Sequence, residues 1–260
     1  MIQVKACRHG RLMFHDNDDY IGRSLNISGV YSEEELQLWE QIIRIGWTVV
    51  EVGANIGAHS VWLSKAVGKT GKIIAIEPQR HIYNMLCGNL ALNMIKNVYP
   101  MLCAMSSCAG TACIRDIDYT KPGNFGGISL DDQKGDVCVI ALDNLNLVPH
   151  FIKIDVEGME ADVIRGALQT IERHRPVLYV ENDRPEKSDE LIELIHGLGY
   201  RLFWHRPLIN RDLFGPTVSI NMLCVDADAD VTGLDQVVIE RDQAVRSKAL
   251  APAIEHGAVI

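Results

Sequence analysis

The sequence lacks any long hydrophobic run. None of its apolar stretches approaches the roughly 18 residues that a membrane-spanning helix needs. The N-terminus, MIQVKACRHGRLMFHDNDDY, lacks the apolar core of a secretory signal peptide. Both absences favour a cytoplasmic protein that does not bind to a membrane.

The chain also has few positive charges. Lys and Arg total 25 against 34 Asp and Glu, so the formal net charge is −9, and the basic residues form no cluster. A protein that binds nucleic acid or an anionic membrane needs clustered cations for the phosphate groups. The composition therefore argues against both partners.

Cysteine spacings typical of metal or redox sites are missing. The chain has seven cysteines, and Cys103, Cys108 and Cys113 follow one another every five residues, which fits neither a zinc knuckle nor a redox pair. We interpret them as free thiols that pack as small hydrophobic side chains.

What is present is an alternation of apolar strands and amphipathic helices. It predicts an α/β fold, a Rossmann-like sheet that is mostly parallel with helices on both faces and ligands at the carboxyl ends of its strands. The predicted strands are 48–52, 71–77, 97–105, 137–142, 151–155, 176–182, 200–205 and 219–225, and the predicted helices are 58–67, 81–93, 161–174 and 188–198.

Three segments divide the chain. Residues 1–45 form an N-terminal extension with a helix over 32–45, where Ser32 and Glu35 have the spacing of a capping box. Residues 46–226 form the ligand-binding domain. Residues 227–260 form a tail, predicted to be helical over 234–249 or partly disordered. The helix that carries Trp39 and this tail are the candidate surfaces for a homo-oligomer.

The turn VVEVGANIGAHS, residues 49–60, joins a strand to a helix and so lets a ligand approach the backbone. Its glycines, Gly53 and Gly57, are spaced G-x-x-x-G, without the third glycine of the dinucleotide fingerprint, and Glu51 lies close by. A pyrophosphate is poorly served by a nearby carboxylate, whereas the sulfonium and ammonium of S-adenosylmethionine are attracted to one. The turn therefore favours S-adenosylmethionine over NAD.

Glu77 ends the next strand, twenty residues after Gly57, where a carboxylate can accept hydrogen bonds from both ribose hydroxyls. With this acid in register, the glycine turn becomes a specific signal. The predicted cofactor-binding residues are Glu51, Gly53, Asn55, Gly57, His59, Ser60, Glu77, Ser106 and Asp155.

Several motifs together resemble the FkbM family of S-adenosylmethionine-dependent methyltransferases: EVGANIG (51–57), AIEP (75–78), NFGGISL (124–130), FIKIDVEGME (151–160) and RPVLYVEND (175–183). The resemblance covers roughly residues 20–226, and KIDVEG is its most distinctive part. It implies a seven-stranded sheet whose last strand, near 219–225, is antiparallel. It also implies O-methylation of hydroxyls on sugars or polyketide-type natural products.

Acidic residues follow two strands that this fold normally places side by side. Asp155, Glu181 and Asn182 offer hard oxygen ligands suited to Mg²⁺, similar to the site of metal-dependent catechol O-methyltransferases. Such an ion would lower the pKa of the acceptor hydroxyl. The alternative is a metal-free site in which Asp155 contacts the methionine part of the cofactor and Glu157 or His205 is the base, with Lys153 orienting Asp155.

Two irregular segments are predicted to contact the acceptor. The first, 121–132, matches the family's loop at Asn124, Phe125 and Ser129. The second follows Trp204 and contributes Asn210, Phe214 and Asn221. Its weaker match to the family leaves the acceptor's identity open.

The leading functional hypothesis is therefore O-methylation of a sugar or natural-product hydroxyl. N-methylation of an amino sugar or peptide-like substrate is the alternative, and it would need no metal because nitrogen acceptors need less activation. An NAD(P)-dependent oxidoreductase and a non-catalytic binding module are more remote hypotheses.

Overall fold

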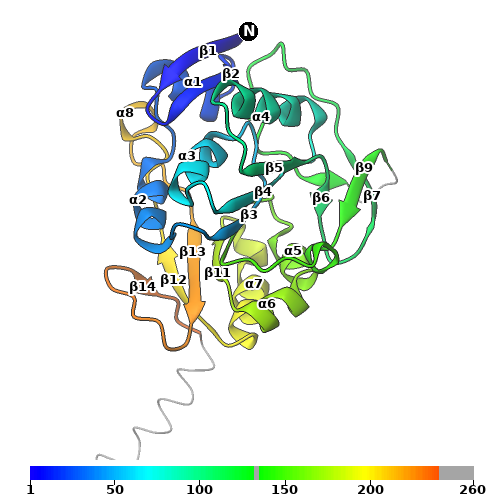
Figure 1. Ribbon diagram of the computed structural model, residues 1–260, viewed down its shortest axis with the longest axis vertical. Coiled ribbons are helices and arrows are strands. Elements are labelled where there is room, and N and C mark those ends of the chain that lie inside the picture. Colours follow the sequence, from blue (N-terminus) through cyan, green and yellow to red (C-terminus); the bar gives the residue numbers. More distant parts are fainter. Residues whose placement is uncertain (132–134, 240–260) are drawn as a thin grey trace, which may run out of the picture.

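An eight-stranded mixed sheet forms the centre of the structure, a computed structural model that describes residues 1–131 and 135–239 (Figure 1). Five neighbouring strands are parallel, so their carboxyl ends share one edge. β13 lies antiparallel between β11 and β12. In spatial order the strands are β14 (Asp235–Gln236), β12 (Tyr200–His205), β13 (Asn221–Asp226), β11 (Val177–Glu181), β10 (Phe151–Ile154), β3 (Thr48–Val52), β4 (Lys72–Ile76) and β5 (Val98–Met101).

This arrangement confirms the predicted Rossmann-like fold, including an antiparallel last long strand, β13. The sheet has eight strands where the resemblance implied seven, because β14 pairs with β12 at the edge, with Asp235 opposite Trp204. β14 lies in the tail, which the sequence did not predict to join the sheet.

Helices cover both faces of the sheet, which is why β10 is buried along its whole length. One face packs against α5 (Glu160–Arg165), α6 (Leu168–His174) and α7 (Pro185–Gly197). The other packs against α2 (Glu33–Ile42), α3 (Ala58–Ala66) and α4 (Arg80–Leu92). The predicted helix over 161–174 is thus two short helices, α5 and α6.

The sequence did not predict the elements before α2. β1 (Ile2–Cys7) and β2 (Gly10–His15) form a hairpin that lies beside α4 with α1 (Ile21–Ile27), at the top of Figure 1. Leu12, Phe14 and Leu25 pack there with residues of α3 and α4. The hairpin and α1 therefore extend the structure above the carboxyl edge of the sheet.

The remaining elements are short. A second sheet combines β6 (Ala104–Met105), β9 (Val137–Ile140), β7 (Gly110–Ile114) and β8 (Leu130–Asp131). The 3-10 helix η1 (Leu142–Leu145) leads into β10, and α8 (Arg211–Phe214) lies between β12 and β13.

Two local predictions were wrong. Ser32 and Glu35 form no capping box: Ser32 has a φ of 48° and its side chain caps no backbone N–H, while Glu35 turns into the interior. The tail forms no helix over 234–239, because this part runs as β14 and extended chain against the sheet. The rest of the predicted helix, 240–249, lies outside the described residues.

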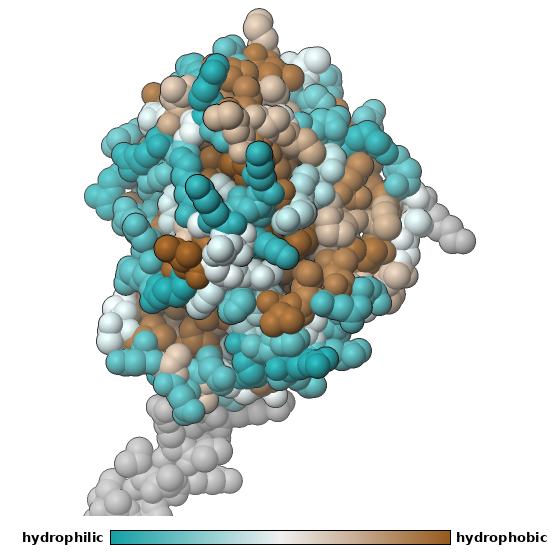
Figure 2. Space-filling view, in the orientation of Figure 1, coloured by the Kyte–Doolittle hydropathy of each residue, from teal (hydrophilic) through white to brown (hydrophobic). Residues whose placement is uncertain are grey.

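Within the described ranges, no helix is long and apolar enough to cross a membrane. On the face shown in Figure 2, hydrophilic side chains are interspersed with hydrophobic ones, as is usual for protein surfaces. This face does not test the predicted homo-oligomer, which stays a prediction.

Candidate active site

A cavity of about 440 Å³ lies at the carboxyl edge of the sheet. It is bounded by the turns after β3, β4, β10 and β11, by the segment from α1 to α2, and by the irregular segments around Asn124 and Ser219. Of the residues predicted for the site, those that line the cavity are Gly53, Asn55, His59, Glu77, Asn124, Asp155, Glu157 and Glu181.

The glycine turn forms one wall of this cavity. Gly53 has a φ of 83°, and a Cβ atom there would lie 1.9 Å from the backbone oxygen of Asp155. Asn55 also has a positive φ, 51°, and its side-chain oxygen accepts a hydrogen bond from the N–H of Ile56 at 2.7 Å. The turn thus brings the ends of β3 and β10 close together, and only glycine fits at Gly53.

Glu77 is held in place by the same turn. Its two carboxylate oxygens accept hydrogen bonds from the backbone N–H of Asn55 at 3.0 Å and of Gln79 at 2.8 Å. Glu77 is 3% exposed, and burial raises the pKa of its carboxyl group to about 7. Because each carboxylate oxygen has two lone-pair sites, each can accept one further hydrogen bond from a ligand.

A smaller apolar pocket adjoins the cavity. Gly53, Glu77 and Asp155 line both. The hydrophobic side chains that line the smaller pocket are Val52, Ile76, Pro78, Ala104, Met105, Ile128, Val156 and Met159. Glu77 thus lies between an apolar pocket on one side and a polar cavity on the other.

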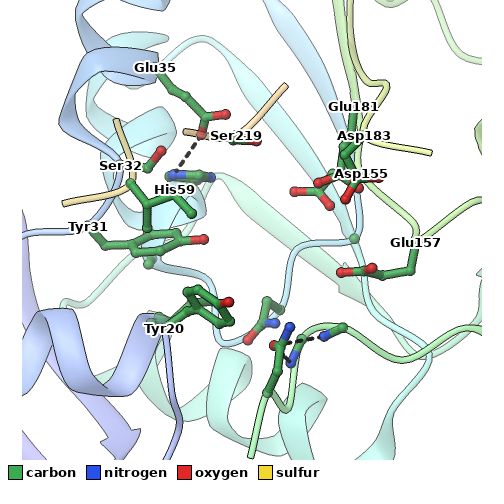
Figure 3. Close-up of a pocket in the computed structure, with 18 of the residues that line it drawn as sticks. Tyr20, Tyr31, Ser32, Glu35, His59, Asp155, Glu157, Glu181, Asp183 and Ser219 are labelled. Atoms are coloured by element: carbon green, nitrogen blue, oxygen red, sulfur yellow. Dashed lines mark hydrogen bonds and ion pairs between the residues drawn. The ribbon is translucent and has the colours of Figure 1, made fainter. Parts of the chain in front are cut away.

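Three carboxylates gather on the side of the cavity formed by β10 and β11 (Figure 3). Asp155, Glu157 and Glu181 each place an oxygen within 4.8 Å of the others. Burial, and then the charge of Asp155, raise the pKa of Glu157 to about 7 and that of Glu181 further. Oε2 of Glu181 is buried and has no hydrogen-bond partner. Three oxygen donors at this spacing can hold a cation.

Asn182 does not join these carboxylates. Consecutive residues of a strand point to opposite faces of a sheet, so Glu181 and Asn182 point in opposite directions. The Asn182 amide is buried and donates to the sulfur of Met222 at 3.3 Å. Glu157 supplies the third oxygen donor instead. Its backbone has a φ of 57°, which places its carboxylate beside those of Asp155 and Glu181.

A buried lysine lies beneath the glycine turn. Lys153 donates to Asp155 at 2.9 Å and to the backbone oxygen of Gly53 at 3.3 Å. The strand register places Glu51 beside it on β3. Although burial opposes its charge, the carboxylates of Asp155, Glu51 and Glu35 raise the pKa of Lys153, so it stays charged.

Glu51 is fully buried and does not reach the cavity. One of its oxygens accepts a hydrogen bond from the hydroxyl of Ser60, and the other has no partner. Burial raises the pKa of Glu51 to about 7. Its position beside Lys153 makes it a buried counter-charge below the site.

Glu35, which the sequence analysis missed, faces these carboxylates from the opposite side (Figure 3). Its Oε2 lies 3.5 Å from Nε2 of His59, and its Oε1 accepts from Asn221 at 2.9 Å and from Tyr179 at 3.2 Å. His205 lies 2.7 Å from the Tyr179 hydroxyl and does not line the cavity. The sequence analysis did not predict this role, because the capping-box spacing suggested that Glu35 pairs with Ser32.

The loop predicted to contact the acceptor does border the cavity. Asn124 lines it, and its side-chain oxygen accepts from the N–H groups of Gly126 and Gly127 at 3.1 and 2.9 Å. Phe125 points away and is buried beside the hairpin, with its backbone oxygen bound by Gln79 at 2.9 Å. Ser129 donates to the backbone oxygen of Glu157 at 2.9 Å. Phe125 and Ser129 thus anchor the loop.

Several predicted residues lie behind the cavity wall. Gly57, with a φ of 79°, begins α3. Ser106 lies after β6, where its backbone N–H donates to Ile140. Those that line neither pocket are Glu51, Gly57, Ser60, Ser106, Phe125, Ser129, Asn182, His205, Asn210, Phe214 and Asn221. Tyr20, Tyr31 and Arg184 line the cavity although the sequence gave no periodic signal for them.

Comparison with protein families finds a match over most of the central sheet. The methyltransferase FkbM domain matches residues 51–202, more than half of the chain. The matched part contains the glycine turn, Glu77 and the three carboxylates.

Individual proteins are similar over shorter stretches or at low identity. Methyltransferase sdnD of Sordaria araneosa is 41% identical over 64 residues, which are 24% of this chain and 24% of that protein. The match thus spans about a quarter of this curated relative. The crystal structure of methyltransferase FkbM from Methylobacillus flagellatus KT is 17% identical with a TM-score of 0.49, covering 79% of this chain and 55% of that one. A methyltransferase from Aquifex aeolicus is 17% identical with a TM-score of 0.44, covering 77% of this chain and 91% of that one.

Proposed function

We infer that this chain, which belongs to the FkbM methyltransferase family, is an S-adenosylmethionine-dependent methyltransferase, and we propose that it methylates a hydroxyl of a sugar or natural-product small molecule. One observation carries the proposal. An acidic cavity and an apolar pocket meet at Glu77 and Gly53, at the carboxyl edge of the sheet.

The residues present fit this cofactor. Glu77 would bind the ribose hydroxyls, and the apolar pocket beside Met105 suits the adenine ring. Asp155 and the glycine turn would hold the methionine part, whose ammonium and sulfonium are attracted to carboxylates. When bound, the cofactor supplies an electrophilic methyl group. A pyrophosphate would be repelled by the same carboxylates, which counts against NAD.

Calorimetry on the full-length protein tests the cofactor. We expect one S-adenosylmethionine to bind per chain and NAD not to bind. Glu77→Ala should weaken S-adenosylmethionine binding by about 1–3 kcal/mol, because hydrogen bonds to a carboxylate are lost. Glu172→Ala removes an exposed carboxylate from α6 and is the matched control, with unchanged affinity. Equal affinities of the Glu77→Ala and wild-type proteins would refute the ribose assignment.

The acceptor side of the cavity supports an oxygen acceptor. Its wall combines hydroxyl and amide groups from Tyr20, Tyr31, Asn124, Thr217 and Ser219, which can bind the hydroxyls of a sugar-like molecule. The acidic excess would also accept an amino group, so N-methylation of an amino sugar or peptide-like substrate stays the alternative. The atom that carries the transferred methyl group in the product distinguishes the two.

We also propose a divalent ion, Mg²⁺ by its donor chemistry, bound by Asp155, Glu157 and Glu181. The unpartnered Oε2 of Glu181 supports this, because a buried carboxylate oxygen is costly without a proton or a cation. When bound, such an ion would act as a Lewis acid toward the acceptor oxygen.

Metal binding can be measured without an acceptor. We expect Mn²⁺, titrated into the full-length protein and followed by electron paramagnetic resonance, to occupy one site that Mg²⁺ displaces. Glu181→Gln should abolish this site, whereas Asp162→Asn, which changes a carboxylate on α5, should not. A wild-type protein that binds no Mn²⁺, or a Glu181→Gln protein that binds it normally, would eliminate this metal site.

A further inference from the structure

A histidine and a glutamate face the three carboxylates across the cavity (Figure 3). We propose that Glu35 and His59 form a catalytic dyad in which His59 takes the proton of the acceptor hydroxyl and Glu35 holds and balances the resulting imidazolium. The inference rests on the proposed O-methylation and assigns its general base.

The position of His59 suits a base. It lies in the first turn of α3, directly after the glycine turn, and it lines the cavity although it is only 7% exposed. Its buried Nε2 lies 3.5 Å from Oε2 of Glu35 and forms no hydrogen bond, and the other ring nitrogen points toward the cavity (Figure 3). A proton on Nε2 would therefore leave the lone pair of Nδ1 directed at the acceptor.

Aromatic side chains fix the plane of the ring. Tyr31 stacks on His59 with 5.5 Å between ring centroids, and Trp39 meets it edge to face at 5.0 Å. Both neighbours are in or beside α2, the helix that carries Glu35. The ring is thus held on two sides by the same part of the chain that supplies its carboxylate.

Glu35 is in turn fixed by its other oxygen. Asn221 and Tyr179 both donate to Oε1, Oε2 faces His59, and the Ser32 side chain also forms a hydrogen bond with this carboxylate. This is the arrangement of a carboxylate that orients a catalytic imidazole and selects its tautomer. Beyond Tyr179, half-buried His205 completes a hydrogen-bonded line that leads away from the cavity.

Two of the carboxylates on the cavity wall are less suited to accept the proton. Asp155 is paired with Lys153, and Glu157 is paired with Arg184. Burial, followed by the charges of Lys153 and His9, lowers the pKa of His59, so the ring is neutral at pH 7 and its lone pair is available.

The proposed step transfers a methyl group to the acceptor and a proton to His59. The acceptor oxygen forms a bond to the methyl carbon as the carbon–sulfur bond breaks, and that electron pair remains on sulfur. The acceptor O–H bond breaks, and its proton goes to Nδ1 of His59. The imidazolium is paired with the Glu35 carboxylate until the proton leaves.

Nitrogen NMR of the full-length, ¹⁵N-histidine-labelled protein tests the dyad without cofactor or acceptor. We expect the His59 ring, assigned by its loss in His59→Gln, to hold its proton on Nε2 and to keep Nδ1 bare. Glu35→Gln should remove this tautomer preference, and the signals of distant His150 should not change. A His59 proton on Nδ1 in the wild-type protein would overturn the proposal, because the nitrogen facing the cavity could not act as a base.

Kinetics add a second readout, using the acceptor that gives most product with the wild-type enzyme. His59→Gln should lower kcat at least about 100-fold, as expected for the loss of a general base. An unchanged kcat would overturn the dyad and leave the proposed function intact. A wild-type protein that binds no S-adenosylmethionine would instead refute the proposed function, whatever the tautomer of His59.

Discussion

Gly53→Ala should destabilise the protein and abolish S-adenosylmethionine binding. The residue has a φ of 83°, and an added Cβ atom would lie 1.9 Å from the backbone oxygen of Asp155. The left-handed conformation alone costs an alanine about 1–3 kcal/mol. The clash costs more, because it is with backbone and not with a flexible side chain. The ends of β3 and β10 must then separate, which displaces Asp155 and the glycine turn together.

Chemical denaturation and calorimetry measure the two effects of this substitution. Gly197→Ala is the matched control, since its added methyl group meets no atom within 4 Å and it ends α7 away from the site. Alanine is favoured over glycine in helices, so this control should be neutral or slightly stabilising. A Gly53→Ala protein with wild-type stability and affinity would show that the close approach of the two strands is unnecessary.

Lys153→Met should be among the most destabilising substitutions in the sheet. Lys153 is charged, buried, and surrounded by the carboxylates of Glu51, Glu35 and Asp155. Methionine fills a similar volume but leaves these acids without a counter-charge, and removing one partner of a buried ion pair typically costs about 3–5 kcal/mol. Lys72→Met, on exposed Lys72 of β4 in the same sheet, is the control and should cost little.

The free energy of unfolding that Lys153→Met loses should be larger at high pH than at low pH. The raised pKa of Lys153 keeps it charged throughout pH 5–8, so the carboxyl groups set the dependence. Glu51 has a folded-state pKa of about 7 against an ordinary value of 4.5, so its protonated form favours the folded state and stability falls as pH rises between these values. Lys153 lowers the pKa of Glu51, so without Lys153 the stability should fall more steeply as pH rises. Urea denaturation that gives a larger loss for Lys153→Met at pH 5.5 than at pH 8 would contradict the account.

The sequence predicted those site residues whose positions depend only on the strand order. Gly53, Glu77, Asp155 and Glu181 each end a parallel strand or begin the turn after it, and parallel strands bring their carboxyl ends together. Hydrophobic periodicity and motif spacing are therefore enough to place these four residues at one edge of the sheet.

The site predictions that were wrong or missing have identifiable physical causes. Asn182 was expected beside Glu181, but neighbouring residues on a strand face opposite ways. Glu35 lies on a helix that precedes the sheet, and only tertiary packing brings it to His59 and Asn221, 186 residues later in the chain. The spacing of Glu35 from Ser32 has a local interpretation that the left-handed conformation of Ser32 does not allow. Contacts between residues this far apart in the chain cannot be predicted from the spacing of nearby residues in the sequence.

Methyl transfer by the wild-type, full-length protein tests the central claim most directly. The protein would be incubated with methyl-labelled S-adenosylmethionine and a panel of hexoses, methyl glycosides, amino sugars and hydroxylated polyketides, and the products analysed by mass spectrometry and NMR. We predict a labelled methyl ether on a hydroxyl-bearing acceptor. Label found only on nitrogen, or no labelled product from any acceptor, would contradict the account.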